Sequence, residues 1–229
     1  MNEHTLKTAA VVPVKSFHAS KSRLSPFLDD VQREAISQLM MKYTLGVLCK
    51  LDFLTQIIVV SYDEFVGRLA EAFGADYLCQ VENGVNSAVS AADRLCLENG
   101  VQSNIIIPTD LCYLSENEIR LIYYESTKFP SAVAICPSKR RDGTNFLLRN
   151  PLSMFETSYD NNSYYNHLSL AGNSRAHMIM IESENLERDI DIPQDIVDAI
   201  EHQPMNKMTK IFQEILSQRN SLLNRPDKP

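Results

Sequence analysis

Short apolar runs alternate with longer segments of helical period, and this alternation constrains the fold more than any other feature. The runs "TAAVVPV" (8–14) and "TQIIVVS" (55–61) are almost wholly apolar and rich in β-branched residues, which is typical of strands buried on both faces. The segments 29–51 and 85–100 instead carry apolar residues at helical spacing. Strands that alternate with helices predict an α/β fold with a mostly parallel sheet covered on both faces.

The same patterns recur along the chain and divide it into elements. Strands are predicted at 8–14, 55–61, 75–80, 103–110, 131–137, 145–150 and 175–183. Helices are predicted at 29–51, 64–74, 85–100, 115–127 and 193–202, and a further helix with a charged tail within 205–229. Asp29 or Asp30 would cap the first helix, and Ser115 with Glu118 would form a capping box. We expect one domain over 1–203, followed by a C-terminal helix and tail over 204–229.

Charge and composition exclude several classes of protein. The net charge of −7 disfavours binding to nucleic acid. The N-terminus "MNEHTLKTAA" lacks the apolar core of a signal peptide, and no apolar run approaches the roughly 18 residues of a membrane span. Five separate cysteines without a CxxC pair indicate free thiols in a reducing compartment. We therefore expect a cytoplasmic protein without nucleic-acid or membrane partners, and the choice between a monomer and a homodimer stays open.

Charged and polar residues gather where the predicted strands end. In an open parallel sheet, ligands bind at the carboxyl ends of the strands. Basic residues together with carboxylates at that edge suit an anion with several phosphates and a divalent metal. The residues are Lys15, Lys21, Arg23 and Ser25 after 8–14, Gly84 and Asn86 after 75–80, Asp110 after 103–110, Lys139, Arg140, Arg141, Gly143, Thr144 and Asn145 after 131–137, and Asp189, Asp191 and Asp195 late in the chain.

Each of these groups also has a plainer structural interpretation. The basic segment 15–23 could be a solvated surface turn, whose charges would contribute little to stability. Asp110 could be an ordinary turn residue after a strand. Asp189 and Asp191 could form the solvent face of a strand. "DGTN" could be a hairpin turn. The shared placement of the groups at one sheet edge, with complementary charges, favours a site.

The order of the motifs resembles the 2-phospho-L-lactate guanylyltransferase family of coenzyme F-420 biosynthesis. The resemblance spans roughly residues 8–202 and rests on "PVK…KSRLS", "GVNSA", "PTDL", "DGTN", "NSYYNHL" and "DIDIPQD". Cys112 and Asp160 stand where that family usually has proline and glycine. The resemblance implies a single-domain, Rossmann-like nucleotidyltransferase fold of the GT-A type. It also implies an enzyme that transfers GMP from GTP to a small phosphorylated acid with release of pyrophosphate.

The resemblance further implies a role for each candidate residue. Lys15, Lys21 and Arg23 would hold the GTP phosphates and, with Asp110, act in catalysis. Groups near 12–14 and at Gly84 and Asn86 would contact guanine and ribose. Asp110, Asp189 and Asp191 would bind Mg²⁺. Thr144 and Ser163 would hold the phosphate of the acceptor. From its position in the sequence, Ser163 is also predicted to cap a helix that begins there, whose free N–H groups could bind a phosphate.

The chemistry agrees with the residue types, and alternatives stay open. Two anions must meet, so metal and basic side chains have to offset their repulsion. A substrate phosphate is already ionised near neutral pH, so no protein base is required. The acceptor could be 2-phospho-L-lactate, phosphoenolpyruvate or 3-phosphoglycerate. A related nucleotidyltransferase that uses CTP or UTP, or a non-catalytic nucleotide-binding protein, remains an alternative.

Overall fold

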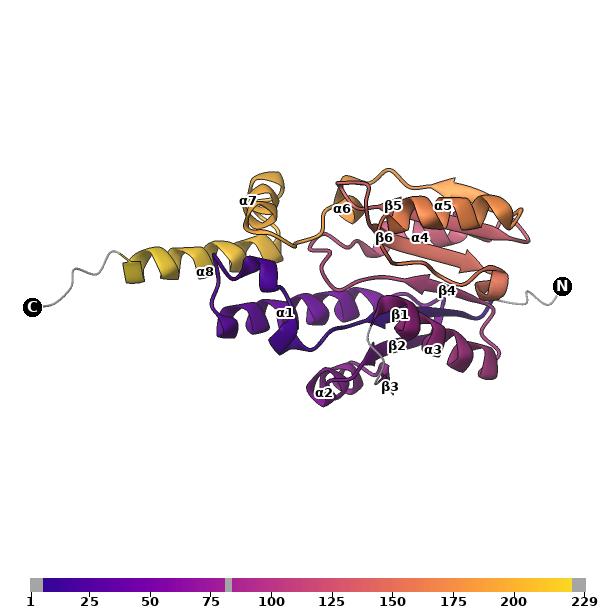
Figure 1. Cartoon of the computed structure of the whole chain (residues 1–229), viewed down its shortest axis with the longest axis horizontal. Coiled ribbons are helices and arrows are strands. Elements are labelled where there is room, and N and C mark those ends of the chain that lie inside the picture. Colours follow the sequence, from indigo (N-terminus) through magenta and orange to yellow (C-terminus); the bar gives the residue numbers. More distant parts are fainter. Residues whose placement is uncertain (1–5, 81–83, 224–229) are drawn as a thin grey trace, which may run out of the picture.

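A single seven-stranded sheet forms the centre of the protein (Figure 1). The computed structural model describes residues 6–80 and 84–223. The strands lie in the order β3-β2-β1-β4-β6-β5-β7, and only β6 runs antiparallel to its neighbours. The predicted α/β fold with a mostly parallel sheet is therefore confirmed. The strands are β1 (Thr8–Pro13), β2 (Leu54–Ser61), β3 (Asp76–Cys79), β4 (Ser103–Ile106), β5 (Ala132–Pro137), β6 (Thr144–Asn150) and β7 (His177–Met180).

Helices cover both faces of the sheet. The helices α1 (Asp30–Leu48), α2 (Glu64–Ala72) and α4 (Glu116–Ser126) contribute to one buried cluster, and α3 (Val85–Glu98) and α5 (Ser163–Asn173) contribute to the other. Strand β1 shows why both faces are apolar: Ala10 and Val12 lie in the first cluster, while Ala9 and Val11 lie in the second. Successive strand residues point to opposite faces, so a doubly covered strand must be apolar throughout.

The direction of β6 follows from its connection to β5. Residues 138–143 join the two strands as a hairpin, and the Ser138 amide donates to the Gly143 carbonyl at 2.8 Å. Thr144 at the start of β6 therefore lies opposite Pro137, at the edge where the parallel strands end. The hairpin interpretation of "DGTN" is correct, and the hairpin also brings Thr144 to the ligand-binding edge.

The two predicted caps have different outcomes. Asp29 caps α1: its carboxylate accepts from the Gln32 amide at 2.8 Å, and the Gln32 side chain accepts from the Asp29 amide at 3.1 Å. Ser115 occupies the N-cap position of α4, but its side chain makes no capping hydrogen bond, so the predicted capping box is wrong. The Oε2 atom of Glu118 is buried and has no hydrogen-bond partner among the described residues.

A third apolar cluster lies beyond the end of the sheet. There α7 (Pro193–His202) and α8 (Lys207–Leu223) pack beside α1, with Met208 and Phe212 of α8 buried (Figure 1). Leu24, one residue beyond Arg23, is fully buried in the same cluster. Cys112 also lies in it, and burial raises the pKa of this thiol to about 12. The predicted last helix is present over Lys207–Leu223, and 224–229 lie outside the described residues.

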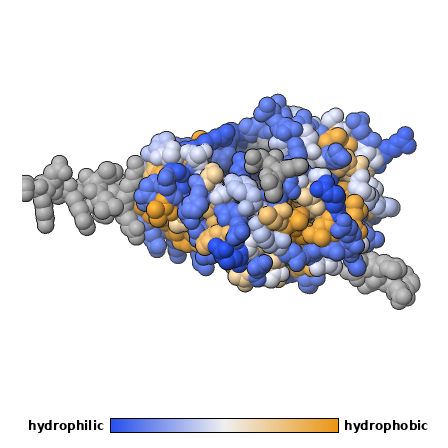
Figure 2. Space-filling model, turned by 60° about the horizontal axis from the view of Figure 1, so that its bottom comes forward, coloured by the Kyte–Doolittle hydropathy of each residue, from blue (hydrophilic) through white to orange (hydrophobic). Residues whose placement is uncertain are grey.

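Short elements complete the chain. They are the 3-10 helices at Phe17–Ala19, Ser22–Leu24 and Leu152–Met154, and α6 (Glu184–Glu187). On the face shown in Figure 2, hydrophilic residues interrupt several apolar areas. Across the described residues, no helix has both the length and the apolar character needed to cross a membrane.

Candidate active site

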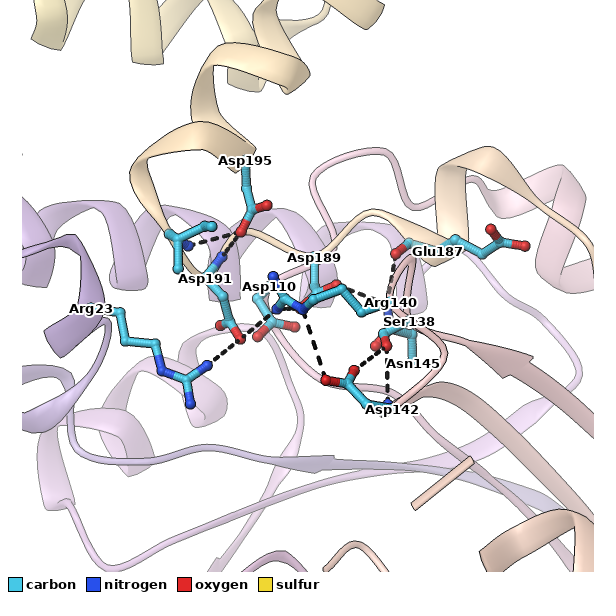
Figure 3. Close-up of polar contacts among 12 residues, drawn as sticks. Arg23, Asp110, Ser138, Arg140, Asp142, Asn145, Glu187, Asp189, Asp191 and Asp195 are labelled. Atoms are coloured by element: carbon cyan, nitrogen blue, oxygen red, sulfur yellow. Dashed lines mark hydrogen bonds and ion pairs between the residues drawn. The ribbon is translucent and has the colours of Figure 1, made fainter. Parts of the chain in front are cut away.

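Three carboxylates meet at the edge where the parallel strands end (Figure 3). Asp110 follows β4, and Asp189 and Asp191 follow α6. The two segments run side by side, because Leu111 and Asp189 form an isolated antiparallel bridge and the Ile190 amide donates to the Asp110 carbonyl at 3.1 Å. Backbone pairing thus brings Asp189 and Asp191 close to Asp110, although they lie 79 and 81 positions after it in the sequence.

Lys21 reaches into this acidic cluster. Its Nζ lies 3.0 Å from Oδ2 of Asp110 and 3.3 Å from Oδ1 of Asp191, and its side chain is only 12% exposed. Burial alone would lower the pKa of Lys21, but the two carboxylates outweigh burial and raise that pKa above its ordinary value of 10.5. Lys21 adopts a left-handed backbone conformation with a φ of 53°. Lys21 is therefore a largely buried, charged partner of the carboxylates and not a solvated turn residue.

Two arginines surround the cluster from different loops. Nη2 of Arg140, in the β5–β6 hairpin, lies 3.8 Å from Asp189 and 3.6 Å from Asp191. Nη1 of Arg23 lies 3.6 Å from Asp191, and the Arg23 side chain is 71% exposed. Both arginines can turn toward an incoming anion, because water already surrounds part of each side chain.

Asp189 is the most crowded of the three carboxylates. Its burial, together with the negative charges of Asp110 and Asp191, raises its pKa to about 6. Asn145 donates to its Oδ1 at 3.4 Å. A divalent cation would relieve this crowding, and carboxylate oxygens are the ligands that Mg²⁺ prefers. Among the described residues, however, no three acidic, histidine or cysteine side chains already have the spacing of a metal site, since Lys21 and Arg140 lie between the carboxylates.

The other residues predicted to contact phosphate and nucleoside make no ion pair or hydrogen bond with this cluster among the described residues. Lys15 is exposed and has no ion-pair or hydrogen-bond partner among the residues described. Gly84 precedes α3 with a φ of 114°, and its carbonyl accepts from the Ser87 hydroxyl at 3.1 Å. The Val14 amide donates to Val60. The motif residues 82 and 83 lie outside the described part of the chain.

Asn86 contacts the loop that precedes α5. Its Oδ1 accepts from the Tyr159 amide at 2.6 Å, and its Nδ2 donates to Asp160 at 3.1 Å. Both functional groups of the Asn86 amide are thus engaged by residues 159–160. The Asp160 carboxylate is thereby held by a hydrogen bond at the start of α3.

Thr144 and Ser163 form a second, buried polar group. Ser163 Oγ donates to Thr144 Oγ1 at 3.3 Å. Ser163 is 4% exposed and Thr144 is 6% exposed. Asn162 occupies the N-cap position of α5, so Ser163 is the first residue of the helix and not its cap. The structure therefore brings these two residues together at the same sheet edge as the acidic cluster, as the motif pattern predicts.

The sequence pattern placed Lys139 and Arg140 among the strand-end residues without an individual role, and it did not single out Arg188. Lys139, Arg140 and Arg188 line a small cavity of about 30 Å³ together with Asp189, Asp195, Asp198 and Ala199. Asp195 accepts from the Asp191 and Ile192 amides at 2.8 Å, so its carboxylate caps the start of α7. The position of Arg140 beside an Asp-Gly turn at a strand end was the available signal.

The chain is similar in sequence, over most of its length, to several guanylyltransferases. It is 32% identical over 83% of its length to 3-phospho-D-glycerate guanylyltransferase of Colwellia psychrerythraea, covering 90% of that protein. It is 32% identical over 82% of its length to phosphoenolpyruvate guanylyltransferase of Rubrobacter xylanophilus, again covering 90%. It is 26% identical over 90% of its length to 2-phospho-L-lactate guanylyltransferase of Methanobrevibacter smithii, covering 89%.

Solved structures share the fold at low sequence identity. A Desulfovibrio desulfuricans protein assigned as a nucleotide-diphospho-sugar transferase matches with a TM-score of 0.75 at 12% identity, over 90% of this chain and 94% of that one. CMP:2-keto-3-deoxy-manno-octonic acid synthetase, complexed with CTP, matches with a TM-score of 0.57 at 12% identity, over 87% of this chain and 100% of that one. The model of the family described as "Guanylyl transferase CofC like" matches residues 8–219, and the chain therefore belongs to that family of guanylyltransferases.

Proposed function

We propose that the protein transfers GMP from GTP to a small phosphorylated three-carbon acid and releases pyrophosphate. The observation that carries the proposal is the contact of Lys21 with Asp110 and Asp191, at the same sheet edge as the Thr144–Ser163 pair. A cation–carboxylate cluster beside a separate group of hydroxyls is what a reaction between two phosphate-bearing substrates requires.

The acidic cluster is the proposed GTP half of the site. Asp110, Asp189 and Asp191 would hold Mg²⁺, whose chemistry is to neutralise phosphate charge and fix the reacting groups in line. Lys21, Arg23 and Arg140 would contact the triphosphate and stabilise the charge that moves onto the leaving pyrophosphate. Lys15 would reach the phosphates from its exposed position, and Gly84 with Asn86 would border the nucleoside.

The Thr144–Ser163 pair is the proposed acceptor half. A phosphate oxygen of the acceptor forms a bond to the α-phosphorus of GTP, and the bond from that phosphorus to the bridging oxygen of pyrophosphate breaks. The acceptor phosphate is ionised near neutral pH, so the protein needs only to orient it. The buried hydroxyl pair from β6 and α5 suits that task, because a hydroxyl proton of the pair can donate to a phosphate oxygen in a largely water-free setting.

The relatives' names support a choice among three acceptors, namely 2-phospho-L-lactate, phosphoenolpyruvate and 3-phospho-D-glycerate. We propose that the product enters coenzyme F-420 biosynthesis in the cytoplasm. We further propose that 1–203 forms the catalytic domain, with 204–229 as a C-terminal helix and tail. A homodimer is a proposed assembly that sedimentation can test.

A product assay by mass spectrometry tests the proposed function. Purified protein with Mg²⁺ is offered each of the four nucleoside triphosphates against each of the three acids, beside an Asp110→Asn control. The expected product joins guanosine to one acid through a diphosphate, and the control forms at least about 100-fold less. Product from CTP or UTP alone would instead indicate a related nucleotidyltransferase, and no product from any pair would contradict the proposal.

A further inference from the structure

His167 is a buried histidine that the proposed mechanism leaves without a role. The residue is 0% exposed and lies four positions after Ser163 in α5, so both side chains project from the same face of the helix. Its Nδ1 lies 2.9 Å from Thr144 Oγ1, and its Nε2 lies 3.0 Å from the Ser158 backbone nitrogen. Both ring nitrogens are therefore bonded.

The Ser158 contact fixes the tautomer of the ring. A backbone N–H can only donate, so Nε2 must be the unprotonated, accepting nitrogen. The ring proton of neutral His167 then lies on Nδ1 and is donated to Thr144 Oγ1. Burial, and secondarily the positive charge of Arg149, lower the pKa of His167 to about 4, which keeps the ring neutral at physiological pH.

The tautomer in turn fixes the direction of the Thr144 hydroxyl. Thr144 Oγ1 accepts from His167 Nδ1 and from Ser163 Oγ, which uses both of its lone pairs. The Thr144 proton is then left to donate, and no acceptor for it is present among the residues that the structure describes. A buried hydroxyl in this state is suited to bind an anion.

We propose that His167 is a positioning residue that holds the Thr144 hydroxyl as a hydrogen-bond donor toward the phosphate of the acceptor. The Tyr159 ring packs edge-on against the imidazole at 4.7 Å between centroids and restrains its rotation. Because Ser158 and Tyr159 belong to the loop that Asn86 holds, the start of α3 supports the same arrangement. The inference rests on the proposed function, since it assigns the acceptor phosphate to this end of the site.

The first experiment measures the tautomer in the intact protein. Long-range ¹H–¹⁵N spectra of ¹⁵N-histidine-labelled wild type at pH 7.5 should show His167 neutral and protonated on Nδ1. The state should persist when phosphoenolpyruvate or 3-phosphoglycerate is added. A ring protonated on Nε2, or on both nitrogens, would overturn the inference without the need for any variant.

The second experiment asks whether His167 acts through Thr144. His167→Leu should weaken binding of the acceptor acid, measured by calorimetry and as KM, by about 10- to 100-fold, the scale of a hydrogen bond to a charged group. The KM for GTP should stay within about twofold. His167→Asn keeps an amide N–H near the position of Nδ1 and should recover part of the loss. His177→Gln, at the exposed edge strand β7, is the matched control and should resemble wild type.

A double-mutant cycle separates positioning from general structural support. If His167 acts through Thr144, the Thr144→Ala/His167→Leu double variant should bind acceptor no more weakly than Thr144→Ala alone. Losses that multiply in the double variant, or an equal loss of GTP binding, would refute the positioning role. No turnover by wild type with any acceptor would refute the proposed function alone, because the tautomer and the calorimetric affinities do not depend on turnover.

Discussion

Replacing Lys21 by methionine should destabilise the ligand-free protein, although the residue lies in a basic loop at the surface edge of the sheet. The side chain is 12% exposed, and its partners Asp110 and Asp191 are 24% and 31% exposed. Removal of one member of a fully buried ion pair costs about 3–5 kcal/mol, whereas an exposed pair contributes about 0.2–1 kcal/mol. The intermediate burial here predicts a loss of about 1–3 kcal/mol, or a fall in Tm of roughly 2–12 °C.

The assay is thermal unfolding at pH 7.5 of wild type, Lys21→Met and the matched control Arg23→Met. Arg23 comes from the same loop and also contacts Asp191, but it is 71% exposed, so its replacement should change the free energy of unfolding by less than about 0.5 kcal/mol. The pKa of Lys21 is raised in the folded state, so its stabilisation is fully present below pH 10.5 and is lost only as the pH rises through the higher folded-state value. A pH of 7.5 is therefore inside the window.

Added Mg²⁺ provides a second readout on the same samples. With Lys21 gone, the uncompensated carboxylates should gain more from a divalent cation, so Tm should rise further in Lys21→Met than in wild type. Equal melting temperatures for Lys21→Met and Arg23→Met would refute the argument that Lys21 is a buried partner. An equal response of wild type and Lys21→Met to Mg²⁺ would refute the assignment of these carboxylates to metal.

Three further predictions concern activity, the core and pH. Asp110→Ala and Asp191→Ala should each lower turnover by at least about 100-fold with the fold retained, and wild-type rates with Mg²⁺ in either variant would exclude it as a metal ligand. Arg149→Met should lower the free energy of unfolding, measured in urea, by about 3–5 kcal/mol, because the fully buried guanidinium pairs with Asp93 at 2.7 Å. An unchanged unfolding midpoint would contradict this prediction. Because the pKa of His167 is lowered to about 4 in the folded protein, its contribution to stability is fully present above pH 6.5 and is lost as the pH falls toward 4. The free energy of unfolding should therefore depend less on pH between 6.5 and 4 in His167→Gln than in wild type. Parallel pH profiles of the two proteins would disprove this.

The architecture was predictable because it follows from local patterns. Continuous apolar runs such as 8–14 need cover on both faces, and their alternation with segments of helical period predicts that helices supply it on a parallel sheet. The reversed direction of β6 depended on one choice, namely whether "DGTN" closes a hairpin, and the sequence left that choice open. The capping box predicted at Ser115 does not form, although the residue types fit, and the Oε2 atom of Glu118 is instead buried without a partner among the described residues.

The site was predictable as a location and not as a set of contacts. Strand-end residues were expected at one edge, and Asp110, Asp189 and Asp191 do meet there. The pairing of Lys21 with Asp110 and Asp191, however, joins residues 89 and 170 positions apart, and no local pattern specifies it. The bond between Asn86 and Asp160 spans 74 positions and was equally out of reach.

The third apolar cluster has a consequence for the order in which parts of the protein can fold during synthesis. The chain leaves the ribosome from its N-terminus, so the Lys21 loop emerges early, together with β1. Leu24 of that loop is buried against a cluster that includes Met208 and Phe212, which emerge almost 190 residues later. The sheet can pair while translation continues, but this loop gains its last packing partners only near the end. A nascent chain should therefore acquire its fold before it can bind a triphosphate firmly.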